Sequence, residues 1–72
     1  MNKDELQKAI DLKKETIVNN RADYFKSLKE NLPMIDDMEY LFRVIEDAAD
    51  YLKSTEKSLY IIKVQQGVID AM

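Results

Sequence analysis

The sequence predicts an all-α protein built as a long helical hairpin, with helices at about residues 3–31 and 36–71. The chain has one Gly and one Pro among 72 residues, which is too little turn chemistry for an all-β fold. A break falls at residues 31–34, and apolar residues recur at helical spacing on both sides of it. At this length residues 1–72 form a single domain.

The first helix is predicted from an uninterrupted stretch that begins at Lys3 and contains neither Gly nor Pro. Asn19 and Asn20 are its weak point, because two poor helix formers stand together there and could divide it. At about 100° per residue, five apolar residues fall within a narrow arc of the helix. They are Leu6, Ile10, Ile17, Tyr24 and Leu28.

The turn is predicted from Pro33, which cannot continue a helix and biases Leu32 toward extended geometry. A new helix should begin at once, since Asp36 and Glu39 have the spacing of a capping box. We therefore expect the second helix to start at about residue 36.

The second helix is predicted from a seam whose positions alternate steps of three and four, the 3.5-residue period of coiled coils, and eight of its ten positions are apolar. The seam comprises positions 38, 41, 45, 48, 52, 55, 59, 62, 66 and 69. Two alternatives stay open. Ser54 or Thr55 could cap a third helix, giving a three-helix bundle with a break near residues 53–57. Residues 59–64 could instead form a strand, because they are rich in β-favouring side chains.

Apolar residues near the C-terminus exceed what a two-helix seam can cover. A chain of this size buries only about 60% of its unfolded surface, and it has no Cys for disulfide bonds. A second copy would hide the surplus, so we expect a homodimer that pairs two hairpins into a four-helix bundle. The predicted self-association residues are Tyr60, Ile61, Val64, Val68 and Met72.

An acidic patch is predicted on the side of the second helix that faces away from the seam. Residues 32–50 hold six acidic residues and one arginine, a net charge of −5. The patch either faces water or binds another protein with a basic surface. Its residues are Asp36, Glu39, Glu46, Asp47 and Asp50, and an apolar flank of Tyr40, Val44 and Tyr51 adjoins it.

Most catalytic chemistry is excluded by composition. The chain has no His and no Cys, which removes imidazole and thiolate metal ligands and the usual partners of a nucleophilic serine. No glycine-rich phosphate loop is present, and we expect no metal and no cofactor. The eleven Lys and Arg residues are scattered among 14 acids, which argues against direct nucleic-acid binding. No apolar run is long enough to cross a membrane, and we expect a cytoplasmic protein.

These observations predict a small non-enzymatic protein that binds another protein, as a regulator or inhibitor, through an amphipathic acidic helical surface. Two alternatives remain. The chain could be a structural unit, a self-assembling coiled-coil scaffold. It could also be an acidic nucleic-acid mimic that blocks a DNA- or RNA-binding protein.

Overall fold

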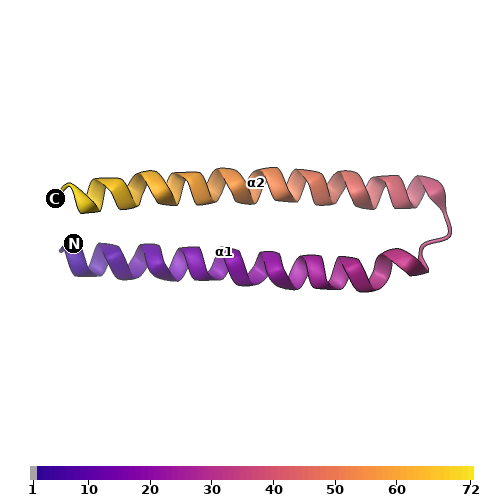
Figure 1. Cartoon of the computed structure of the whole chain (residues 1–72), viewed down its shortest axis with the longest axis horizontal. Helices are drawn as coiled ribbons and strands as arrows, with labels where there is room; N and C mark the ends of the chain where they lie inside the picture. Colours follow the sequence, from indigo (N-terminus) through magenta and orange to yellow (C-terminus); the bar gives the residue numbers. More distant parts are fainter. Residues whose placement is uncertain (1) are drawn as a thin grey trace.

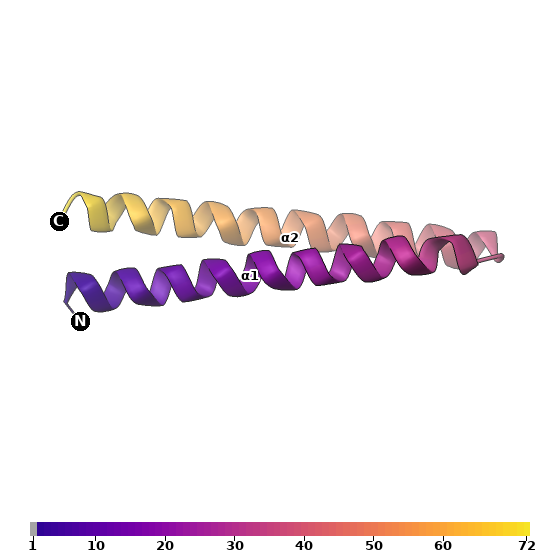
Figure 2. The ribbon, with the colours of Figure 1, turned by 60° about the horizontal axis from the view of Figure 1, so that its bottom comes forward.

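The computed structural model describes residues 2–72 and shows a hairpin of two long antiparallel helices (Figure 1). Helix α1 spans Lys3–Asn31, a 3₁₀ turn η1 spans Leu32–Met34, and α2 spans Met38–Asp70. The particle measures 53 × 16 × 14 Å, so it is one layer of two helices. The chain ends lie together at the end opposite the turn (Figures 1 and 2). The predicted hairpin is confirmed, and its pairing into a four-helix bundle stays a prediction.

Helix α1 begins with a side-chain cap. The Asn2 Oδ1 atom accepts a hydrogen bond of 2.8 Å from the Glu5 backbone N–H, which satisfies one of the free donors of the first turn. The helix then runs without interruption through Asn19 and Asn20. The weak point that the sequence suggested does not divide it, because the flanking turns pack on α2 at Ile17 and Arg21, both half-buried.

The turn differs from the prediction in two details. Leu32 has helical geometry (φ −53°, ψ −44°) rather than extended geometry, because its N–H bonds the Leu28 carbonyl and closes the last turn of α1. The cap of α2 is Asp37 and not Asp36: its Oδ1 accepts from the backbone N–H groups of Glu39 (2.9 Å) and Tyr40 (3.4 Å). The 3₁₀ turn takes up residues 32–34, and α2 therefore starts later than the expected residue 36.

Helix α2 continues through residues 53–57, so the three-helix alternative is wrong. The hydroxyl group of Thr55, one of the two predicted caps, bonds to its own helix, as does that of the nearby Ser58. Thr55 Oγ1 donates to the Leu52 carbonyl at 3.0 Å, and Ser58 Oγ donates to the Ser54 carbonyl at 3.1 Å. Since these hydroxyls bond within α2, they do not cap a new helix. Residues 59–64 are helical too, and the predicted strand is absent.

The interface between the helices is narrow. The buried residues of α2 are Ala48, Thr55, Ile62 and Ile69, each seven positions after the last. None of the residues of α1 is fully buried. An aromatic cluster adds contact area near the turn, where the Tyr51 ring lies 4.3 Å from the Tyr24 ring between centroids.

The predicted seam holds in the C-terminal half of α2 and at Leu41, Ala48 and Leu52, but it fails near the turn at Met38 and Ile45. Met38 and Ile45 are 60% and 48% exposed, although the seam prediction placed both against α1. Val44 and Tyr51 are half-buried in their place. The half-buried or buried residues near the turn recur 18 positions later, and 18 residues are about five turns of an ideal helix. Positions 41, 44, 48 and 51 thus reappear as 59, 62, 66 and 69.

This recurrence explains the error. A strict seven-residue repeat drifts by about 20° per heptad on a straight helix. Figure 2 shows the two helices inclined to each other, so the side of α2 that meets α1 changes along its length. Over the length of α2 this drift approaches one residue position. The half-buried residues beside the buried ones are therefore Leu59 and Gln66 in the C-terminal half, but Val44 and Tyr51 near the turn.

Candidate protein-binding surface

The exposed apolar side chains gather on α2. Three apolar residues are buried in the described chain, whereas twelve large ones are exposed. Helix α1 supplies only Leu12 and Val18 to the exposed set, and η1 supplies Met34. Helix α2 and the C-terminal residue supply the rest, which are Met38, Tyr40, Phe42, Ile45, Tyr60, Ile61, Val64, Val68 and Met72.

The C-terminal cluster predicted from the sequence is exposed in the hairpin. Tyr60 and Met72 are 67% and 69% exposed, and Val68 is 60% exposed. By helical spacing, Val64 projects away from α1, opposite the buried Ile62 and Ile69, whereas Ile61 and Val68 lie to one side of the seam. The hairpin itself therefore does not cover this cluster.

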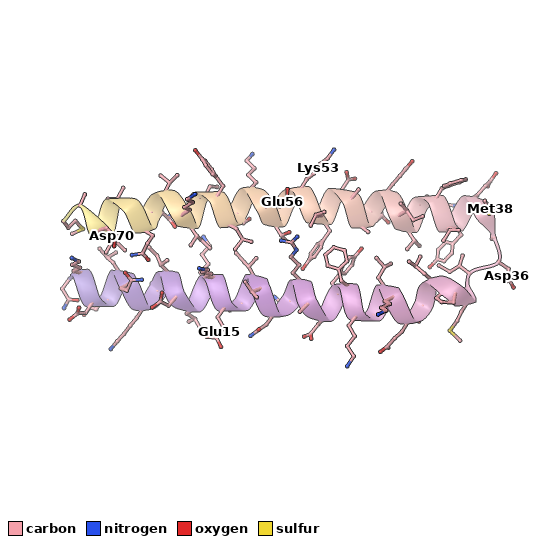
Figure 3. The ribbon with its side chains drawn as sticks, viewed as in Figure 1. Glu15, Asp36, Met38, Lys53, Glu56 and Asp70 are labelled. Atoms are coloured by element: carbon pink, nitrogen blue, oxygen red, sulfur yellow. The ribbon has the colours of Figure 1, made fainter. Side chains whose placement is uncertain are left out.

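The acidic patch is also exposed at all five of its predicted positions, Asp36, Glu39, Glu46, Asp47 and Asp50. Asp36 lies in the connection between the helices, and Lys53, just beyond the patch, points away from α1 (Figure 3). By helical spacing, Glu39, Glu46 and Asp50 project on the same side of α2 as Val64 and Val68. We call this line the outer face of α2: it is acidic near the turn and apolar near the C-terminus.

The predicted apolar flank is divided between two environments. Tyr40 is 53% exposed, whereas Val44 and Tyr51 are half-buried against α1. The Tyr51 ring packs on Tyr24, and its centroid lies 6.4 Å from that of Phe25. Val44 lines a shallow cleft with Tyr24 and Leu28, and Asp47 stands at the same cleft. Two of the three residues of the apolar flank, Val44 and Tyr51, therefore pack within the hairpin, and only Tyr40 remains exposed.

A second apolar stripe, missed at the sequence level, lies on one side of the seam. We call it the flank stripe: Met38, Phe42, Ile45, Ala49 and Leu52. All but the half-buried Leu52 are exposed, and their steps of four and three residues repeat the coiled-coil spacing. The sequence signal for this stripe was Phe42, a large apolar residue outside the predicted seam, which is 57% exposed in the hairpin. Phe42 is four residues after Met38 and three before Ile45. Met38 and Ile45 therefore fit a second seam with Phe42 as well as they fit the predicted one.

A polar pair joins the helices near the chain ends. The Gln7 and Gln66 side-chain amides donate to each other, and both bonds are 2.7 Å. Asp11 accepts from Gln7 and Asp70 accepts from Gln66, each at 3.0 Å. A slip of one helix along the other would leave these half-buried amides without each other, so the pair fixes the register.

Two apolar grooves flank this end of the hairpin. One holds about 370 Å³ and is lined from α1 by Leu6 and Ala9 and from the C-terminal segment by Val68 and Met72. The other holds about 600 Å³, lies on the same side as the flank stripe, and has Val18 and Lys63 among its lining residues. Both grooves are open, and each leaves the seam accessible from one side.

The described residues contain no cluster of three or more His, Cys, Asp or Glu that could hold a metal ion. Within residues 2–72, neither helix is long and apolar enough to cross a membrane. Comparison with known proteins finds no matching family model, no matching curated protein and no matching solved structure. The most distinctive feature of the hairpin is therefore the surface of α2, which exposes both apolar and acidic side chains.

Proposed function

We propose that this chain is a non-enzymatic helical-hairpin protein that works by binding another protein, as a regulator or inhibitor. The observation that carries the proposal is the imbalance between exposed and buried apolar side chains. Twelve large ones are exposed and three apolar residues are buried, in the part of the chain described. Exposed apolar patches on this scale mark interaction surfaces.

The total surface area supports the proposal. A compact monomer of 8.4 kDa exposes about 4,600 Å² by the scaling of globular proteins. The hairpin exposes 5918 Å², an excess of about 1,300 Å². A standard protein–protein interface buries about 800 Å² on each partner. The hairpin therefore has enough surplus surface for an interface of ordinary size.

The outer face of α2 suits a partner that is basic at one end of its site and apolar at the other. Glu39, Glu46 and Asp50 would meet the basic part, and Val64 and Val68 the apolar part. Charges at an interface raise the association rate and select the partner, whereas apolar contacts supply most of the affinity. Because α2 is one uninterrupted helix, both parts are held at a fixed separation.

Charge reversal tests the acidic half. Glu46→Lys with Asp50→Lys should weaken capture of the partner from a lysate, while the helical circular dichroism stays unchanged. The matched control reverses two exposed acids of α1, Glu15 and Asp23; Glu15 points away from α2 (Figure 3). Equal capture by both variants and the wild type would remove the acidic patch from the proposal.

The same capture experiment separates the two alternatives. A scaffold unit that binds only itself would capture no other protein with any variant. A nucleic-acid mimic would capture a DNA- or RNA-binding protein, and free DNA or RNA would compete for it. That competition should be accompanied by a steep loss of binding as salt is raised.

A further inference from the structure

We propose that the flank stripe is a second coiled-coil seam, and that its occupant is the same flank of a second copy of this chain. The inference deepens the proposed function by giving the dimer a defined interface. It also separates self-pairing from partner binding, because the outer face of α2 is a different side of the helix. The sequence had assigned self-pairing to the C-terminal cluster instead.

The first argument is the composition of the side of the hairpin that carries the flank stripe. We call this side, to which both helices contribute, the flank. Near the turn, α2 presents the five apolar residues of the stripe, and α1 presents Ala22, Phe25 and the charged Lys29 on the same side, with Val18 farther from the turn. Val18 marks that side, because it lines the larger groove together with residues of α2 that lie 18 positions beyond the stripe. These residues are Lys63, Gly67 and Asp70, the counterparts of Ile45, Ala49 and Leu52. The rim that α2 gives to this side is therefore apolar near the turn and polar near the chain ends, where the floor of the larger groove stays apolar.

The second argument is area. Two separate hairpins expose about 11,800 Å², twice the 5918 Å² of one. A compact particle of twice the mass exposes about 7,700 Å². Pairing into a fully compact particle would bury at most about 4,100 Å² in total, and obligate homodimers bury about 2,000–5,000 Å². Only a face that includes both helices can approach this area, since the outer face of α2 belongs to one helix.

The third argument fixes the orientation. If both turns lie at the same end, the apolar half of one flank covers the apolar half of the other, and the polar halves also meet. If the turns lie at opposite ends, each apolar half covers a polar half when the hairpins overlap fully. The same-end arrangement places α2 of one copy over α1 of the other. Because Gln7 and Gln66 lie at the same level along the hairpin, Lys63 then stands across from Asp11 of the second copy, an opposite charge, and Ile45 stands across from Lys29.

A matched pair of substitutions tests the interface. Ile45 lies in the flank stripe and Val64 on the outer face, both are β-branched residues of α2, and they are 48% and 51% exposed. Ile45→Lys should raise the dimer dissociation constant at least about 100-fold in sedimentation, because it buries an unpaired charge in each copy. Val64→Lys should leave the dissociation constant unchanged. The reverse result, or a wild-type chain that stays monomeric at every concentration, overturns the proposal.

A distance measurement on an otherwise unchanged chain covers the case in which Ile45→Lys fails to fold. The chain has no Cys, so Met34→Cys gives one spin label on the 77% exposed residue of the turn. In the proposed dimer the two labels lie at the same end, well below the 53 Å length of the hairpin from each other. A distance near that length, or no label-to-label distance at all, contradicts the arrangement.

Discussion

The Gln7–Gln66 pair gives a prediction whose size can be worked from the structure. Each amide donates to the other at 2.7 Å in a half-buried position. Replacing one residue with Leu removes both bonds. Net contributions of about 0.5–1.5 kcal/mol per bond give a loss of about 2 kcal/mol. The half-buried Leu returns about 1 kcal/mol through apolar burial.

Each single variant, Gln7→Leu or Gln66→Leu, should therefore be about 1 kcal/mol less stable than the wild type. The double variant loses the same two bonds only once and gains two leucines, so its stability should equal that of the wild type within about 0.5 kcal/mol. The coupling free energy between the two sites is then about 2 kcal/mol, which is the contribution of the bonds themselves.

Thermal unfolding followed by circular dichroism would measure this cycle. A loss of 1 kcal/mol lowers Tm by about 4–8 °C in a domain of this size. All four proteins must be compared at one concentration, because self-association would make Tm depend on it. If the effects of the two substitutions simply add, the amides do not bond each other in solution and the register assigned to the hairpin is wrong.

Three further predictions concern stability. Ile62→Ala removes a side chain that is 4% exposed and should cost about 2–5 kcal/mol, enough to abolish most helical dichroism in a fold of about 3–5 kcal/mol. Asp37→Ala should cost about 1 kcal/mol in denaturant unfolding, because Asp37 caps α2; an equal loss in Asp36→Ala would contradict that cap. Gly67→Ala should raise Tm, since an added Cβ meets nothing within 4 Å and Ala favours a helix by about 1 kcal/mol; a lower Tm would reveal a close neighbour there.

The single hairpin has a weak core. Residues of α1 are at most half-buried, and the buried apolar residues are Ala48, Ile62 and Ile69 within the described chain. Such a core supplies little stability beyond the entropy lost on folding. Binding to a second chain adds stability by mass action, so folding and association should be coupled in this protein.

The candidate surface could be anticipated only in part. Charge and helical spacing place Glu39, Glu46 and Asp50 away from α1, and the structure agrees that they are exposed. The flank stripe was not anticipated, since Met38 and Ile45 fit either of two adjacent seams. Periodicity identifies an apolar side of a helix, but it does not say which of two neighbouring lines of residues meets the partner helix.

The sequence by itself determined the two helices, the turn at Pro33 and the outward position of the acidic side chains. These features depend on local chemistry: helix propensity, the missing N–H of proline, and the projection of neighbouring residues. The tertiary structure alone decided how far α2 is rotated about its axis, and hence that Val44 and Tyr51 face α1 while Met38 and Ile45 do not. That rotation depends on contacts between the two helices, such as the packing of Tyr51 on Tyr24, which no window of sequence contains.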